Sequence, residues 1–157
     1  MTEEGKVRQR TIGGLVVRRP GNLDEPVLAL LRAQNVCVIN THGTRGEIHS
    51  RVVWVDTDGE HIVVNSVGGR VWVGDLERDP NVTCTVVNLS NPYEFLSVEG
   101  RLAERTVEGA DEHIDFFARK YLGLDVYPFH SATEPRMIFR VAPTRILHVS
   151  PEAPALQ

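Results

Sequence analysis

The chain has 157 residues, a formal net charge of −4 and an isoelectric point of about 5.9. This length suits one globular domain, and an acidic chain without a basic stripe excludes an ordinary nucleic-acid-binding protein. No apolar run approaches the ~18 residues needed to cross a membrane, and the N-terminal segment is polar, unlike a signal peptide. We therefore expect a cytoplasmic protein that binds neither nucleic acid nor membranes.

The predicted elements follow a polar N-terminal segment. Asn22 or Asp24 is suited to cap a first helix, with Pro26 in its first turn, and this helix is predicted to end near Gln34. We divide the chain into three parts, an N-terminal arm over 1–21, a barrel domain over 22–150 and a C-terminal tail over 151–157.

Apolar runs bounded by turn signals predict a series of strands. They span Val36–Thr41, Ile48–Val55, His61–Ser66, Val82–Asn88, Glu94–Glu104, Met137–Val141 and Arg145–Val149. The pair Asp58-Gly59 predicts a hairpin turn, and the last two strands are expected to meet at Pro143. With 22 valines, the composition also favours β structure. Both cysteines, Cys37 and Cys84, lie in these runs and are expected to be reduced and buried.

Two helices are predicted to interrupt the strands. A short one runs from about Gly69 to Arg78, and a longer one runs from about Val107 to Tyr121, with His113 on its solvent-facing side. Strands at short spacing with few helices predict a mainly β fold, a small and nearly closed antiparallel barrel with peripheral helices.

One segment suits a phosphate group. A strand is predicted to end at Asn65-Ser66, Gly68 and Gly69 allow a tight turn, and Arg70 then opens a helix. Free N–H groups at a helix start and an adjacent guanidinium together favour an anion. The alternative is a plain strand-to-helix turn with a solvated arginine.

A second candidate lies on the strand over 48–55. Arg51 interrupts an otherwise apolar strand and could reach a ligand, or could extend to water or pair with Glu47. Trp54 could belong to the core or form a stacking platform. The six histidines show no metal-ligand spacing, and no nucleophile elbow, Cys-x-x-Cys pair or P-loop is present. A site with no dedicated nucleophile or base is expected where a bound cofactor does the chemistry.

The order of these motifs carries a family resemblance. After the first helix come a strand over 33–41, a Gly-x-x-Gly-x-x-His turn, the strand from Arg51, the Asp58-Gly59 hairpin, Asn65-Ser66, Arg70, a Leu-Glu-Arg-Asp-Pro segment over 76–80, Val98-Glu-Gly100 with Leu102, and Val141-Ala-Pro-Thr-Arg145. This order resembles the pyridoxamine-phosphate-oxidase-like split-barrel superfamily over roughly residues 23–150. The resemblance implies a split β-barrel of about six or seven antiparallel strands that works as a homodimer.

Within that superfamily the chain is similar to the branch that uses the deazaflavin coenzyme F-420, or in some members FMN. The chain is short, and its end, from Arg145, lacks the Arg-Leu-His-Asp-Arg-type segment with which the oxidase holds its substrate. The implied function is an oxidoreductase that transfers a hydride between the deazaflavin and a small organic substrate. The alternatives are an FMN-dependent oxidoreductase of the same fold and a non-catalytic carrier of a cofactor or haem.

The resemblance also implies which residues bind the cofactor. They are Arg51, Val52, Val53 and Trp54 along the ring and ribityl chain, Asn65, Ser66, Gly69, Arg70 and Trp72 around the phosphate, and Phe95, contributed by the partner subunit. Trp72 stands where the family usually has a phosphate-binding lysine, and Asp75 stands where it often has asparagine. Restoring the family residue by Trp72→Lys is therefore expected to leave cofactor affinity unchanged or to tighten it.

Overall fold

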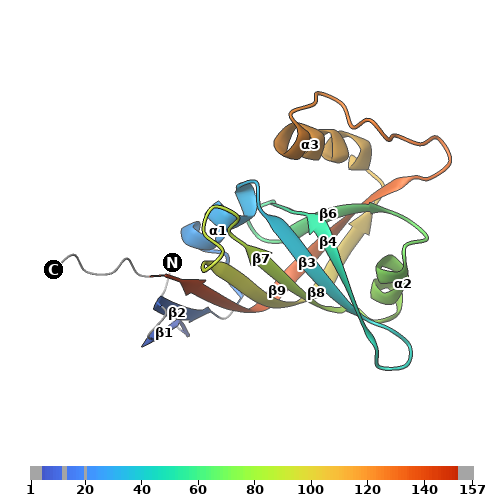
Figure 1. The fold of residues 1–157 in the computed structure, drawn as a ribbon. Helices are drawn as coiled ribbons and strands as arrows, with labels where there is room; N and C mark the ends of the chain where they lie inside the picture. The colour runs from blue at the N-terminus through green and yellow to red at the C-terminus, as the bar shows by residue number, and fades with distance from the viewer. Residues whose placement is uncertain (1–4, 12–13, 20, 152–157) are drawn as a thin grey trace.

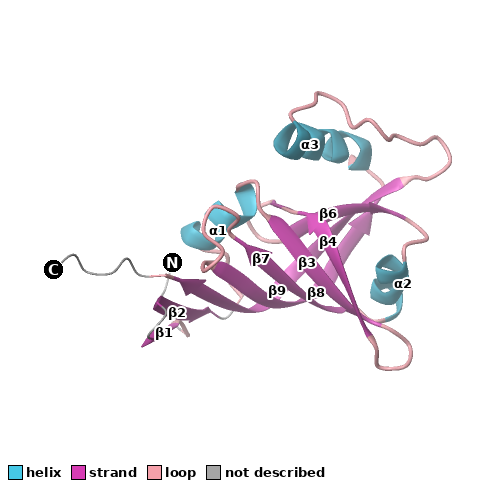
Figure 2. Cartoon of the chain, viewed as in Figure 1, coloured by secondary structure: helices cyan, strands magenta, loops and turns pink. Residues whose placement is uncertain are grey.

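The structure is a computed structural model that describes residues 5–11, 14–19 and 21–151. Figures 1 and 2 show a barrel of strands with helices at its periphery. The helices are α1 (Glu25–Arg32), α2 (Val71–Arg78) and α3 (Ala110–Leu122). The strands are β1 (Val7–Thr11), β2 (Gly14–Arg19), β3 (Val36–His42), β4 (Ile48–Trp54), β5 (Asp56–Thr57), β6 (Ile62–Val67), β7 (Asn81–Val87), β8 (Phe95–Thr106) and β9 (Arg136–Ser150).

The pairing of the strands is antiparallel throughout and leaves the barrel open along one seam. Hydrogen-bonded neighbours follow the order β1-β2-β9-β8-β7-β3-β4, and β6 pairs with β5 and with β9. Among the described residues, the pairing therefore runs from β6 through β9 and round to β4 without a ladder between β4 and β6. The prediction of a mainly antiparallel split barrel with peripheral helices is confirmed.

Strand β9 corrects the prediction of two strands meeting at Pro143. It is one continuous strand, paired with β6 over its first half and with β2 over its second half. Proline lacks an N–H and is tolerated here because the register with β8 shifts between Glu99 and Gly100. A Cβ on Gly100 would lie 2.7 Å from Val141 Cγ1 and 2.8 Å from Ala142 O, so glycine allows this close approach.

The segment predicted as an N-terminal arm contains the hairpin of β1 and β2. Strand β2 pairs with the second half of β9, with Val17 opposite His148, so this hairpin extends the sheet. Residues 152–157 of the predicted C-terminal tail lie outside the described residues.

The interior of the barrel follows from alternation along the strands. Every second residue of β3 is buried, and the free thiols of Cys37 and Cys84 are both buried, as predicted. Helix α1 begins as expected, because the Asp24 carboxylate accepts a hydrogen bond from Val27 N and proline lies in the first turn. It ends at Arg32, slightly before the predicted position, and covers one end of the core.

Helix α3 is anchored by its C-terminal turn to the bend between β4 and β5. The bend is at Val55, whose N–H donates to the Tyr121 hydroxyl at 3.1 Å and whose carbonyl accepts from Lys120 Nζ at 2.6 Å. Lys120 Nζ also donates to Leu31 O at 2.9 Å, which ties α3 to α1. Burial lowers the pKa of the Lys120 ammonium to about 8 and raises the pKa of the Tyr121 phenol to about 12.

This anchor predicts a specific dependence of stability on pH. The Lys120 pKa is lower in the folded chain, at about 8, than in the unfolded chain, at ~10.4. The unfolded state therefore binds more protons between these values, and the contribution of Lys120 to stability increases with pH. We expect the free energy of unfolding of the native chain, relative to Lys120→Met, to increase from about pH 8 to about pH 10 and to be constant below about pH 7.

Urea unfolding at a series of pH values measures this difference. Arg119→Met is the matched control, because it removes a cation from the same turn that does not titrate in this range. A difference between native chain and Lys120→Met that stays flat across the alkaline range would contradict the assignment.

Candidate functional site

A pocket of about 610 Å³ lies along the open seam of the barrel. Its walls come from β3 and β4, from the end of β6 with the start of α2, from α3, and from the region that leads into β9. The lining residues are Val36, Arg51, Val52, Val53, Trp54, Asn65, Ser66, Gly69, Arg70, Val71, Trp72, Ile114, Phe117, Tyr127 and Arg136.

Nine of the ten residues predicted to bind a cofactor line this pocket, and Phe95 does not. Four consecutive residues come from β4, two from β6, and three from the turn and helix that follow β6. These segments are adjacent because β4 and β6 face each other across the seam, and β6 leads directly into α2. The structure therefore brings the two separately predicted candidates, the glycine turn and the Arg51 strand, into one site.

The start of α2 forms one end of the pocket. Gly69 has a positive φ of 80°, which glycine adopts without strain, and nothing lies within 4 Å of where its Cβ would be. Arg70 is the N-cap residue, one position before the first helical turn in which it was predicted. The N–H groups of Val71 and Trp72 have no acceptor within the helix, so together with the exposed Arg70 they suit an anion.

Trp72 lines the pocket, but most of its side chain is packed in the core. It is 4% exposed, and its ring centroid lies 5.4 Å from that of Phe139. The expectation that Trp72→Lys would preserve or tighten cofactor binding stays a prediction, and the burial of Trp72 adds a cost in stability to it. Lysine at this position would place an ammonium among apolar side chains and leave part of the Trp72 volume empty, and both effects destabilise the fold.

Asp75 does not present its charge to the pocket, although the sequence suggested a negative charge nearby. It is buried, and its carboxylate accepts hydrogen bonds from Thr41 Oγ1 at 2.8 Å, His49 Nδ1 at 2.6 Å and Arg78 Nη2 at 2.6 Å. Burial alone would raise the pKa of this carboxyl, but these hydrogen bonds outweigh burial and lower it. Asp75 thus fixes α2 against β3 and β4, and its charge is compensated.

An aromatic cluster around Trp54 forms another wall of the pocket. The indole of Trp54 stacks on Tyr121 with ring centroids 5.1 Å apart and an interplanar angle of 5°. Phe117 and Tyr127 meet the same indole nearly edge-on, at 6.1 and 6.2 Å. Trp54 is half-buried, so it is held by neighbours on one side and lines the pocket on the other.

Arg51 reaches solvent at the pocket edge. Its side chain is exposed and Nη1 donates to Ser50 O at 2.8 Å, while Glu47 accepts a hydrogen bond from Arg45 N. Of the sequence alternatives, the pairing of Arg51 with Glu47 is not seen among the described contacts. The guanidinium is free to turn towards a ligand in the pocket.

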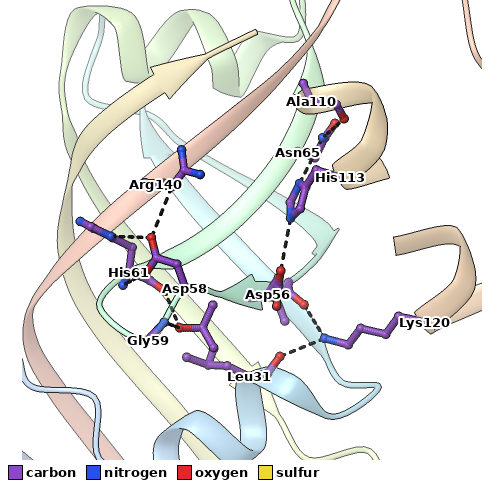
Figure 3. A network of polar contacts seen from close by, with 12 residues as sticks. Leu31, Asp56, Asp58, Gly59, His61, Asn65, Ala110, His113, Lys120 and Arg140 are labelled. Carbon is purple, nitrogen blue, oxygen red and sulfur yellow. Dashed lines mark hydrogen bonds and ion pairs between the residues drawn. The ribbon is translucent and has the colours of Figure 1, made fainter. Parts of the chain in front are cut away.

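The prediction from the sequence that His113 lies on the solvent-facing side of α3 is wrong. Its side chain is 12% exposed, Nδ1 lies 3.2 Å from Asn65 Nδ2, and Nε2 lies 3.4 Å from Asp56 Oδ2 (Figure 3). Its ring packs on Phe117 with centroids 4.4 Å apart. The four-residue spacing from His113 to Phe117, which places both on one helix face, was the sequence signal for this position.

Sequence reasoning also missed Arg136 and Tyr127. Arg136 opens β9 opposite Val67 of β6, and its guanidinium carbon lies 4.5 Å from the centre of the Tyr127 ring. Both residues line the pocket. They belong to a segment without periodicity or motif, so only the pairing of β9 with β6 brings them to the site.

Phe95 lies on the same outer face of the sheet as Trp54, but on a distant strand. The register places Trp54 opposite Val36, Val36 opposite Val87, and Val87 opposite Phe95. This row crosses from β4 to β8, so within one chain β3 and β7 lie between Phe95 and Trp54. Its predicted role therefore requires a second subunit.

The described residues contain no group of three or more histidine, cysteine, aspartate or glutamate residues placed to hold a metal ion. None of the described helices is both long and apolar enough to span a membrane.

Comparison with known proteins places this geometry in a family. The model of the family described as pyridoxamine 5'-phosphate oxidase matches residues 23–150. An F420 reductase structure is similar to this chain with a TM-score of 0.68 and 21% identity, covering 78% of this chain and 97% of that chain. No curated protein matches the sequence.

Two further structures are similar at the level of the fold. A putative pyridoxamine 5'-phosphate oxidase from Listeria innocua has a TM-score of 0.61 and 19% identity, covering 78% of this chain and 94% of that one. A conserved hypothetical protein from Mycobacterium tuberculosis has a TM-score of 0.62 and 17% identity, with coverages of 88% and 96%. From the family match over most of its length, together with the split barrel and its seam pocket, the chain belongs to the pyridoxamine 5'-phosphate oxidase family.

Proposed function

We propose that the chain is an oxidoreductase that binds the deazaflavin coenzyme F-420 in the seam pocket and transfers a hydride between it and a small organic substrate. The family includes oxidoreductases and proteins that bind flavins or related cofactors. The observation that carries the proposal is the composition of one pocket. The pocket combines a helix start that suits an anion with an aromatic wall, and the residues that form it are far apart in the sequence.

The residues present fit such a cofactor. A volume of about 610 Å³ lies within the range of cofactor pockets. Gly69, Arg70 and the first N–H groups of α2 would hold the phosphate, and Trp54 with Phe117 would border the ring system. The bound cofactor would supply the hydride chemistry. The chain's own residues would orient the ring and exclude water, and none of the described residues that line the pocket is a histidine or a cysteine.

An FMN-dependent oxidoreductase is the second candidate. It is favoured by the family match itself, since the family model is that of pyridoxamine 5'-phosphate oxidase. The same pocket and the same phosphate-binding turn would serve FMN. A location in the cytoplasm stays a prediction from the sequence.

The proposal predicts saturable binding of F-420, measured by fluorescence titration, with FMN titrated in parallel. Arg70→Ala should weaken binding by about ten- to a hundredfold, because one charge-assisted hydrogen bond to the phosphate is lost. Arg101→Ala is the control, because Arg101 is an exposed arginine on β8 outside the pocket. Enzymatically reduced F-420 should then be reoxidised in the presence of electron-accepting substrates.

Each outcome of this experiment separates the candidates. Tighter binding of FMN than of F-420 favours the flavin enzyme, and binding without turnover favours a carrier. If neither cofactor binds at tens of micromolar, the proposed function fails. If Arg70→Ala binds as tightly as the native chain, the phosphate lies elsewhere.

We also propose that the active form is an isologous homodimer. Apolar residues on the outer face of the sheet are only partly covered in the single chain, among them Val36, Val38, Val87 and Phe95, and on the edge strand Val52 is 69% exposed. This face is continuous from the pocket edge at Trp54 to Phe95. A second copy packed on it would cover the apolar residues and could place its own Phe95 at the pocket.

The dimer is tested by light scattering at micromolar concentration. We expect twice the monomer mass, and we expect Val52→Asp to shift the mass towards the monomer because it introduces a carboxylate into the covered face. Val107→Asp is the matched control, since Val107 is similarly exposed, at 63% against 69%, but lies between β8 and α3. A monomeric native chain would contradict the proposal and remove the role of Phe95.

A further inference from the structure

Arg136 lies on β9 close to the glycine turn at Gly69. Unlike Arg140 on the same strand, it has no ion pair among the described contacts. It is half-buried, it lines the pocket, and it pairs with Val67, two residues before Gly69. In the part of the chain that the structure describes, no carboxylate forms an ion pair with Arg136. Arg140, on the same face of β9, lies 3.3 Å from Asp58 Oδ2 and 3.0 Å from Glu104 Oε2.

The guanidinium of Arg136 is held in place by Asn65. Arg136 Nη1 donates to Asn65 Oδ1 at 3.1 Å, and Asn65 Nδ2 donates to the carbonyl of Ala110 at 2.9 Å. These two partners fix the orientation of the amide. In the flipped orientation the amide oxygen would face a carbonyl oxygen, and the amide N–H groups would face the guanidinium N–H groups.

His113 completes the support of Asn65. Because Asn65 Nδ2 is a donor, His113 Nδ1, 3.2 Å away, must be the acceptor, and the ring proton therefore lies on Nε2, which faces Asp56 Oδ2 (Figure 3). Both N–H groups of the Asn65 amide are thus used within the protein. The predicted direct contact of this amide with a cofactor phosphate would require breaking one of these bonds.

We propose that Arg136 is a second phosphate-binding residue of the pocket and that Asn65 is the residue that positions it. Trp72 occupies the position where the family usually has a lysine, and its side chain is buried. Arg136 reaches the pocket from β9, where it lies opposite Val67, and would supply the positive charge that this substitution removes. The inference rests on the proposed function and assigns the ligand of Arg136 as the phosphate group of the cofactor.

The physical argument is the cost of a half-buried cation. A guanidinium has five N–H donors, and the described contacts of Arg136 are one hydrogen bond to Asn65 and the face of Tyr127. Stacking on Tyr127 leaves the edges of the guanidinium plane free, and these edges bind a phosphate through two parallel hydrogen bonds. Fixing the side chain in advance reduces the entropy lost when the ligand binds.

The experiment compares ligands that differ only in the phosphate. Fluorescence titration is done with FMN and riboflavin, and with F-420 and the deazaflavin that lacks its phosphate-bearing side chain. Arg136→Ala should weaken the binding of FMN or F-420 by about ten- to a hundredfold and leave the phosphate-free ligands unchanged. Arg140→Ala, on the same strand face but outside the pocket, should change none of the four affinities. Thermal unfolding of each variant verifies that it is folded.

The role of Asn65 is tested by a double-mutant cycle. Asn65→Ala should weaken the phosphate-bearing ligands less than Arg136→Ala does, and it should have no further effect in the Arg136→Ala background. Equal losses for ligands with and without phosphate would overturn the assignment of Arg136 to the phosphate. Additive losses from the two variants would overturn the positioning role of Asn65. If the native chain binds none of these ligands, the proposed function itself has failed, whereas binding unaffected by Arg136→Ala refutes this inference alone.

Discussion

The arrangement of this protein depends on how the backbone of Val55 is satisfied. At the bend between β4 and β5, the N–H and carbonyl of Val55 bond to the side chains of Tyr121 and Lys120 in α3. A strand partner is therefore not needed for Val55, near the point where β4 and β6 diverge. The divergence opens the seam, and the same helix that stabilises the bend supplies Ile114 and Phe117 to the pocket wall. Helix α3 therefore both satisfies the backbone at this bend and forms part of the pocket wall.

The charged side chains near the pocket are separated by sign. The negative charge of Asp75 is buried behind α2 and compensated by three hydrogen bonds, so it fixes the helix whose N-terminus faces the pocket. The positive charges of Arg70 and Arg136 remain uncompensated by carboxylates among the described contacts, and both residues line the pocket. The aromatic cluster around Trp54 lines the same pocket, and Arg136 lies over its Tyr127 ring. A ligand that joins a planar ring to an anionic group matches this distribution better than a uniformly polar or uniformly apolar ligand.

The sequence predicts most of the features that depend on neighbouring residues. The cap at Asp24, the glycine turn at Gly69 and the strand from Ile48 follow from local rules, and the ordered motifs identified the fold. The errors concern tertiary contacts. Pro143 suggested a break, but its missing N–H is accommodated by a register shift opposite Gly100. The motif around Trp72 does not reveal that most of its side chain is buried, because this depends on packing against Phe139. His113 and Arg136 carry no motif, and their place beside Asn65 depends on how α3 and β9 meet β6.

The central claim, that the seam pocket is the cofactor site, can be tested through the two tryptophans of the chain. Trp54 lines the pocket, and the Trp72 indole is packed in the core, so the two indole N–H resonances of an NMR spectrum report on different environments. Trp54→Phe assigns them. We expect titration with F-420 or FMN to shift the Trp54 resonance saturably and to shift the Trp72 resonance less. Binding of either cofactor that leaves the Trp54 resonance in place would contradict the assignment of the seam pocket as the cofactor site.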